Sequence, residues 1–162
     1  MDEAAKKAVL RLFTYGLYVV TCQHGHRRNA FTANWVTQVS FEPPLVALSV
    51  ENQAVSLEFI RGAGQFTLCV LESGTRALAG ALGRSLRDSP TKLEGVAWRE
   101  SASGATDNAP AITECLGWLH CTLHSEAAAG DSTLLIGQVV EATLLKVGQP
   151  LTMREAGFRH SG

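Results

Sequence analysis

The chain has 162 residues, of which 46% are hydrophobic and 18% charged, and its formal net charge is −1 at pH 7 with histidine neutral. This length favours one domain that buries about 70% of the surface of the unfolded chain, and the apolar content excludes a disordered protein. The small net charge argues against nucleic-acid and anionic-membrane partners, which need a basic surplus, and no apolar run reaches the length of a membrane span.

The first half of the chain predicts a helix followed by strands. MDEAAKKAVLRLF has apolar residues at helical spacing and an acidic start, which indicates an amphipathic helix and not a signal peptide. Residues 17–22 and 29–36 predict a hairpin that turns around Gly25. Residues 45–50 form a third, buried strand, and residues 54–61 a short helix that stops before Gly62 and Gly64.

The second half continues in the same manner. Residues 65–71 alternate as a strand, and residues 75–82 predict a second short helix closed by Gly83. Residues 85–108 form an irregular excursion with a short strand at 96–99, and residues 118–126 and 133–145 form a long hairpin that turns at AAAGDS. Many strands with few, short helices predict an all-β protein built as a closed antiparallel barrel.

The four cysteines are Cys22, Cys69, Cys115 and Cys121, and none of them forms a C-x-x-C pair. This spacing disfavours a zinc site and a thioredoxin-like motif. We expect free, mostly buried thiols in a reducing cytoplasm.

The stretch TANWVTQVSFEPPLVALSV carries the clearest sign of a ligand. Thr32, Asn34 and Gln38 are expected to point to one side and to bind the polar edge of a flat ring, while a Pro43-Pro44 corner fixes the turn after Ser40. The alternative is an edge strand with a polar face in solvent.

Two further features suit a phosphate group. The strand that ends near Glu51 leads into a helix whose first turn has unpaired N–H groups; the alternative is a helix capped by Asn52 without a ligand. Arg84, Arg87 and Lys92 are candidate cations, each with a solvated loop as its alternative.

Metal binding is not expected. His24 and His26 flank a glycine, and His120 and His124 share one strand face about 13 Å apart, so these pairs do not converge on one ion. The chain also lacks the Gly-x-Ser-x-Gly, Walker and Rossmann motifs.

The ordered combination of YGLYVVTC, NAFTANWVTQVSFEPPLVALSVEN, FTLCVL, GDSTLLIGQVVEA and PLTMREAGFR resembles the flavin reductase-like family of FMN-binding split barrels. The segment WVTQVSF is similar to the corresponding segment in the reductase domains fused to flavodiiron proteins and in their stand-alone relatives. The resemblance implies that residues 1–162 form one domain, a Greek-key antiparallel split β-barrel with short helices, and a homodimer with an open barrel edge to cover.

The resemblance also implies a flavin site. FMN is the expected cofactor, with FAD as the other flavin, and NAD(P)H is the expected donor. The implied flavin-binding residues are Thr32, Ala33, Asn34, Trp35, Gln38, Val39, Ser40, Ser49, Val50, Glu51, Ala54, Val55 and Arg84. The implied donor-binding residues are the hairpin tip Gly130, Asp131, Ser132 and Thr133.

The implied activity is that of an NAD(P)H:flavin oxidoreductase that moves hydride to flavin for a partner oxygenase, a ferric acceptor or a diiron centre. Because the cofactor carries the chemistry, no catalytic acid or base is assigned. Ser132 stands where the family has a histidine. The segment Asn52-Gln53-Ala54-Val55 has fewer hydroxyl side chains than the Ser/Thr-rich segment that the family often has at this place.

Two alternatives remain open at this point. One is a flavin-binding electron-transfer module that does not use NAD(P)H directly, which the Ser132 departure favours slightly over the reductase. The other is a split barrel that binds another cofactor, such as haem, without reductase activity.

Overall fold

The computed structural model describes residues 1–101 and 109–159. The predicted strand 96–99 lies inside this range, whereas part of the predicted irregular excursion, residues 102–108, lies outside it. In chain order the elements are α1 (Glu3–Leu10), β1 (Tyr18–His24), β2 (Arg27–Ala33), β3 (Val36–Ser40), β4 (Leu45–Glu51), α2 (Val55–Ala63), β5 (Gln65–Val70), α3 (Arg76–Leu82), β6 (Trp98–Arg99), β7 (Ala111–Ile112), β8 (Gly117–Ala129), β9 (Ser132–Leu144) and α4 (Met153–Ala156).

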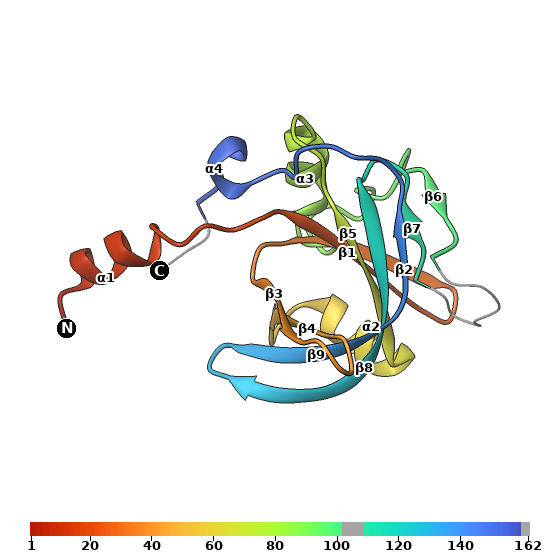
Figure 1. Ribbon diagram of the computed structural model, residues 1–162, viewed down its shortest axis with the longest axis horizontal. Coiled ribbons are helices and arrows are strands. Elements are labelled where there is room, and N and C mark those ends of the chain that lie inside the picture. The colour runs from red at the N-terminus through yellow and green to blue at the C-terminus, as the bar shows by residue number, and fades with distance from the viewer. Residues whose placement is uncertain (102–108, 160–162) are drawn as a thin grey trace.

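Seven of these strands form one antiparallel sheet in the order β2-β1-β5-β8-β9-β4-β3. The sheet curls so that β3, β4 and β9 face β1 and β2, with α2 between them (Figure 1). Within the described residues no ladder joins the edge strands β2 and β3. The predicted all-β class with short helices is confirmed. The barrel is open and split, and not closed as the number of strands alone predicted.

The split lies where a single strand was predicted at residues 29–36. β2 ends at Ala33 and β3 begins at Val36, so Asn34 and Trp35 form a link. The break has a topological reason, because β2 pairs with β1 at one edge of the sheet while β3 pairs with β4 at the other. The link therefore crosses the opening of the barrel.

The β8–β9 hairpin is longer than predicted. The three alanines of AAAGDS belong to β8, and only Gly130 and Asp131 turn, with Gly130 at φ +68° in the region that favours glycine. His120 and His124 do not share a face, because the pairing register shifts between His120 and Cys121 and again between Leu123 and Ser125; His120 is buried and His124 exposed.

The helices begin close to their predicted positions. α2 runs two residues beyond its predicted end and stops at Gly64, which has φ +67°. α3 ends at Gly83 as predicted. α1 extends away from the barrel and has no buried residue (Figure 1). None of the described helices has the length and apolar character needed to cross a membrane.

Two apolar clusters hold the sheet. One fills the barrel interior, where Phe66 of β5 is fully buried against β9 and α2 residues such as Leu57 and Ile60. The other lies between the outer face of the sheet, α3 and the C-terminal segment, and includes Leu82 and Leu151. Both faces of the central strands are covered, which explains the apolar runs in their sequences.

A buried polar cluster fastens the excursion that follows α3. Thr67 and Ser101 both donate to the carbonyl of Ala109, the second at 2.6 Å, and His120 Nδ1 lies 3.0 Å from Thr67 Oγ1 and 3.2 Å from Ser101 Oγ. Burial lowers the pKa of His120, and the charge of Glu141 only partly offsets that effect. The cluster unites two strands and the excursion, and its side chains point into the core.

All four cysteines are free and buried. Burial raises the pKa of Cys22 and of Cys121 to about 12, so these thiols stay protonated and unreactive at neutral pH. Hydrogen bonding of the Cys69 thiol to Cys115, together with burial, raises the pKa of Cys69, and the Cys115 thiol donates to the carbonyl of Ile112 at 3.2 Å.

We therefore expect a thiol reductant to leave the melting temperature unchanged. A disulfide typically contributes about 2–4 kcal/mol, and a loss of that size shifts the melting temperature by several degrees. Differential scanning calorimetry with and without reductant measures the effect, and a matched sample alkylated after unfolding counts the free thiols. A clear drop in melting temperature with reductant would contradict the free-thiol assignment.

Candidate functional site

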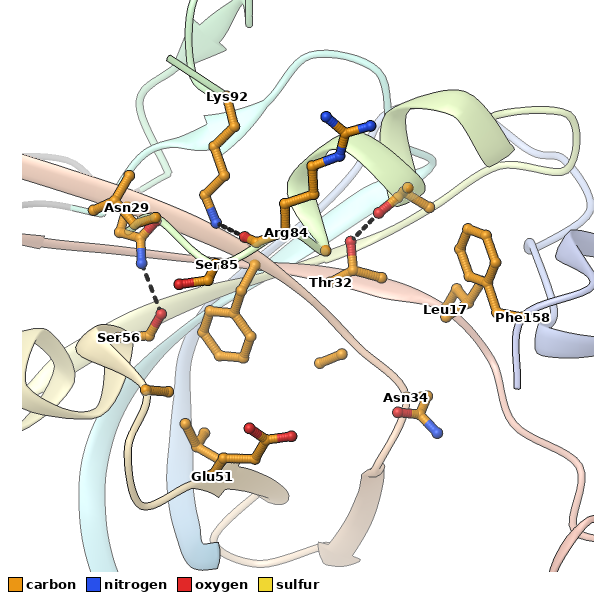
Figure 2. A pocket seen from close by; sticks show the side chains of 18 of the residues that line it. Leu17, Asn29, Thr32, Asn34, Glu51, Ser56, Arg84, Ser85, Lys92 and Phe158 are labelled. Carbon is orange, nitrogen blue, oxygen red and sulfur yellow. Dashed lines mark hydrogen bonds between the residues drawn. The ribbon is translucent and has the colours of Figure 1, made fainter. Parts of the chain in front are cut away.

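A cavity of about 1020 Å³ opens at the split of the barrel. Its walls come from the end of β2 and the following link, the end of β4, the start of α2, the end of α3 with the loop after it, and the C-terminal segment (Figure 2). Segments far apart in the sequence meet here because β2 and β4 lie on opposite sides of the opening. A cavity of this size, lined by a mixture of apolar and polar side chains, is large enough for a cofactor.

Asn34 is the most informative residue of the cavity. Its side chain is only 8% exposed, and among the described residues its Nδ2 atom has no hydrogen-bond partner. A buried amide N–H without an acceptor costs about 1–3 kcal/mol. Asn34 lines the cavity (Figure 2), so its side-chain amide lies within the site that a ligand with a polar ring edge would occupy.

The polar side chains on the β2 side of the cavity are already paired. Asn29 Nδ2 donates to Ser56 Oγ at 2.8 Å, which ties β2 to the first turn of α2. Thr32 Oγ1 donates to the carbonyl of Ala79 at 2.6 Å, which ties β2 to α3. These bonds fix the walls of the cavity and leave Asn34 as its buried donor without a partner in the described chain.

The N-terminus of α2 opens into the same cavity. Its N-cap residue, Ala54, makes no side-chain capping bond, and Ala54, Val55 and Ser56 all line the cavity. Asn52 does not cap the helix, because its side chain donates to the carbonyl of Gly130 at 3.2 Å and accepts from Thr133 at 2.8 Å. The alternative of an Asn-capped helix is therefore wrong, and the N–H groups of the first turn present a positive dipole end to an anion.

The predicted cations behave differently from one another. Lys92 is buried, and its ammonium donates to the carbonyl of Leu82 at 3.2 Å. It also donates to the carbonyl of Arg84 at 2.6 Å (Figure 2). Burial lowers the pKa of Lys92. These hydrogen bonds hold the loop after α3. All three predicted cations line the cavity, Lys92 from a buried position and Arg84 and Arg87 from exposed ones.

Most of the predicted flavin-binding residues come together. The cavity is lined by Thr32, Ala33, Asn34, Trp35, Ser49, Val50, Glu51, Ala54, Val55 and Arg84. Gln38, Val39 and Ser40 do not line it. They belong to β3, beyond the link, where Gln38 is exposed and Nε2 donates to the carbonyl of Ser40 at 3.2 Å, so Thr32, Asn34 and Gln38 do not point to one side.

The predicted donor-binding tip lies beside the cavity and does not line it. Asn52 N donates to the carbonyl of Asp131 at 2.9 Å, which places the tip against the chain that leads into α2. Ser132 is buried, and its hydroxyl donates to Asp131 Oδ1 at 3.1 Å. A part in donor binding stays a prediction for Gly130, Asp131, Ser132 and Thr133.

Several lining residues were not expected from the sequence. Asn29, Phe31 and Ser56 flank the predicted motifs, and the polar pattern of Asn29 and Ser56 was a usable signal. Met153 and Phe158 come from the C-terminal segment, which reaches the cavity through the bridge Gly16↔Thr152. No pattern in the nearby sequence predicts that the C-terminal segment contacts the cavity.

A split antiparallel barrel with a ligand cavity at its opening, a buried unpaired amide and an uncapped helix start define a cofactor-binding barrel protein. The family model described as "Flavin reductase like domain" matches residues 10–162. The chain belongs to the flavin reductase-like family, and its resemblance to that family is confirmed.

Individual relatives agree with this assignment. The chain is 34% identical over 159 residues to the reductase component of 4-hydroxyphenylacetate 3-monooxygenase from Thermus thermophilus, covering 98% of this chain and 96% of the relative. It is 27% identical over 146 residues to diflavin flavoprotein A 1 from Synechocystis, covering 90% of this chain and 25% of that longer protein. The solved NADH:FAD oxidoreductase SgcE6 of Streptomyces globisporus, in complex with NAD and FAD fragments, superposes with a TM-score of 0.82 at 29% identity, covering 98% of this chain and 92% of that one.

Proposed function

We propose that this protein is an NAD(P)H:flavin oxidoreductase that passes reduced flavin to a partner oxygenase. The observation that carries the proposal is the cofactor-sized cavity at the split of the barrel, which is lined by the buried side chain of Asn34 and by the uncapped N-terminus of α2. The relative from Thermus thermophilus, a monooxygenase reductase component, supports the choice of an oxygenase over a ferric or diiron acceptor.

Different residues of the cavity would bind different parts of a flavin. Asn34 and the backbone of the link would bind the polar edge of the ring, and Phe31 and Trp35 add aromatic surface to the cavity. The N-terminus of α2 would hold the phosphate. Bound flavin supplies the two-electron chemistry with NAD(P)H, and the chain supplies orientation, so we assign no catalytic acid or base.

A flavin titration tests the proposal directly. FMN and FAD added to the protein should bind with micromolar affinity or better, which corresponds to about 8 kcal/mol, and a change in flavin fluorescence or absorbance reports the binding. Anaerobic addition of NADH or NADPH should then bleach the flavin absorbance. Bound flavin that neither nucleotide reduces would favour the electron-transfer module, and a lack of flavin binding would favour a barrel for another cofactor.

We also propose that the chain forms one domain over residues 1–162 and acts as a homodimer. α1 has no buried residue, and Val9, Leu12 and Phe13 expose apolar surface on and just after it, which a second copy of the chain would cover. Light scattering on the purified protein gives the mass. Four free, buried thiols support a reducing cytoplasm as the location.

The hairpin tip is the proposed contact for the nicotinamide of the donor. Ser132 offers no aromatic surface, and a stacked ring contributes about 0.5–1.5 kcal/mol. Ser132→His is therefore expected to lower the Michaelis constant for NADH or NADPH about two- to tenfold and to leave flavin affinity unchanged. This comparison reports binding when donor release is faster than chemistry.

Because Ser132 is buried, the control is Ser132→Asn, which enlarges the side chain without adding an aromatic ring. Melting curves of both variants check folding. Equal Michaelis constants for the two folded variants would show that the hairpin tip is not part of the donor site.

A further inference from the structure

A second, shallower cavity of about 570 Å³ continues from the first one. Three arginines, Arg27, Arg28 and Arg87, line it, and we call it the arginine hollow. Its remaining lining is apolar: Val55, Leu86, Pro90 and Leu93. Cations beside an apolar surface are what a phosphate joined to a flat heterocycle requires.

Two of the three arginines pack on aromatic rings, and within the described residues none of the three is paired with a carboxylate. The guanidinium of Arg27 lies 5.0 Å from the ring centroid of Phe59, and that of Arg28 lies 5.2 Å from the ring centroid of Trp98. Within residues 1–101 and 109–159, none of the three arginines forms a salt bridge, and no acidic side chain lines the hollow. The hollow therefore concentrates positive potential over a surface on a protein whose net charge is −1.

The two cavities join at the start of α2. Val55, Leu86 and Arg87 line both of them. Val55 is the first residue of α2, where the phosphate of a flavin is proposed to bind, and Asn34 lies at the ring end of the first cavity. A flavin that runs from Asn34 to the α2 N-terminus thus points its phosphate end into the hollow.

We propose that the arginine hollow binds the adenosine diphosphate end of FAD, so that FAD is the preferred flavin of this protein; the inference rests on the proposed function. Arg27 and Arg87 pair with the second phosphate, and the adenine lies against the apolar lining. FMN ends at the first phosphate and leaves the hollow unused. The adenosine diphosphate of a nicotinamide donor has the same chemistry, but the proposed donor tip lines neither cavity.

Binding affinities test this inference without any turnover. FMN and FAD are titrated separately into the wild-type protein, Arg87→Gln, Arg27→Gln and the control Arg61→Gln, with fluorescence as the readout. Arg61 also carries one positive charge, but it lies at the far end of α2 and pairs with Glu126 at 2.9 Å. Arg28 is left unchanged because its guanidinium also bonds Gln23 within the β1–β2 hairpin.

In the wild type, FAD should bind about tenfold more tightly than FMN, which is about 1.4 kcal/mol. Arg87→Gln and Arg27→Gln should each remove most of that preference by weakening FAD alone, and Arg61→Gln should keep it. Equal affinity of the wild type for both flavins, or unchanged FAD affinity in both Arg87→Gln and Arg27→Gln, would overturn this inference and leave the proposed function standing. No binding of either flavin would overturn both.

Discussion

Replacing Phe66 with alanine should lower the free energy of unfolding by about 3–5 kcal/mol, which is the largest single effect expected in this chain. The ring is fully buried in the barrel interior. It also fills a notch that Gly137 leaves open on β9, where an added Cβ would come within 2.5 Å of Phe66 Cζ. With a glycine opposite, β9 offers no side chain at this position to fill the space that the ring vacates.

Urea unfolding followed by fluorescence or circular dichroism measures this loss. Phe41→Ala is the matched control, because Phe41 is 87% exposed and its removal should change stability by less than about 0.5 kcal/mol. A loss below about 1 kcal/mol for Phe66→Ala would show that the interior collapses around the missing ring, contrary to the tight contact with Gly137.

Asn34→Ala should lower flavin affinity by about 1–3 kcal/mol, which is a factor of about five to one hundred and fifty. The variant removes the side-chain amide that the proposed ligand would contact in the cavity. It also removes a buried polar atom that has no partner within the described chain, so the protein without flavin should be as stable as the wild type or more so. Fluorescence titration and thermal melting of the flavin-free protein measure the two effects separately.

Gln38→Ala is the control for this prediction. Gln38 belongs to the same sequence motif but is exposed and lies outside the cavity. Equal affinities for Asn34→Ala and the wild type, in a folded protein, would mean that Asn34 does not contact the flavin and would take away the main support for the site.

The strands were predictable from the sequence wherever alternation and turn residues agreed. The β1–β2 hairpin around Gly25 and the long β8–β9 hairpin both follow from local pattern. The break at Asn34 and Trp35 was not predictable, because the residues there continue a strand-like run. The strand ends there because the chain must pass from one edge of the sheet to the opposite edge.

The site was predictable where one motif supplied it and not where tertiary contacts did. Residues at the end of β2 and the end of β4 were named from their sequence and line the cavity. Lys92, expected as a cation for a ligand, lines the cavity, and its bonds to two carbonyls are tertiary contacts that the sequence does not reveal. Phe158 arrives from the C-terminal segment, and the spacing of residues along the chain carries no information about such contacts.

The pairing of β4 with β9 determines at which stage of synthesis on the ribosome the cofactor site can form. β4 supplies the wall at Ser49, Val50 and Glu51, and it pairs with residues 132–138. Translation makes β4 long before β9, so a nascent chain carries this wall on a strand that lacks one of its two neighbours. Flavin therefore cannot guide the early folding of the chain, and the site is completed only after almost all of the sequence has been synthesised.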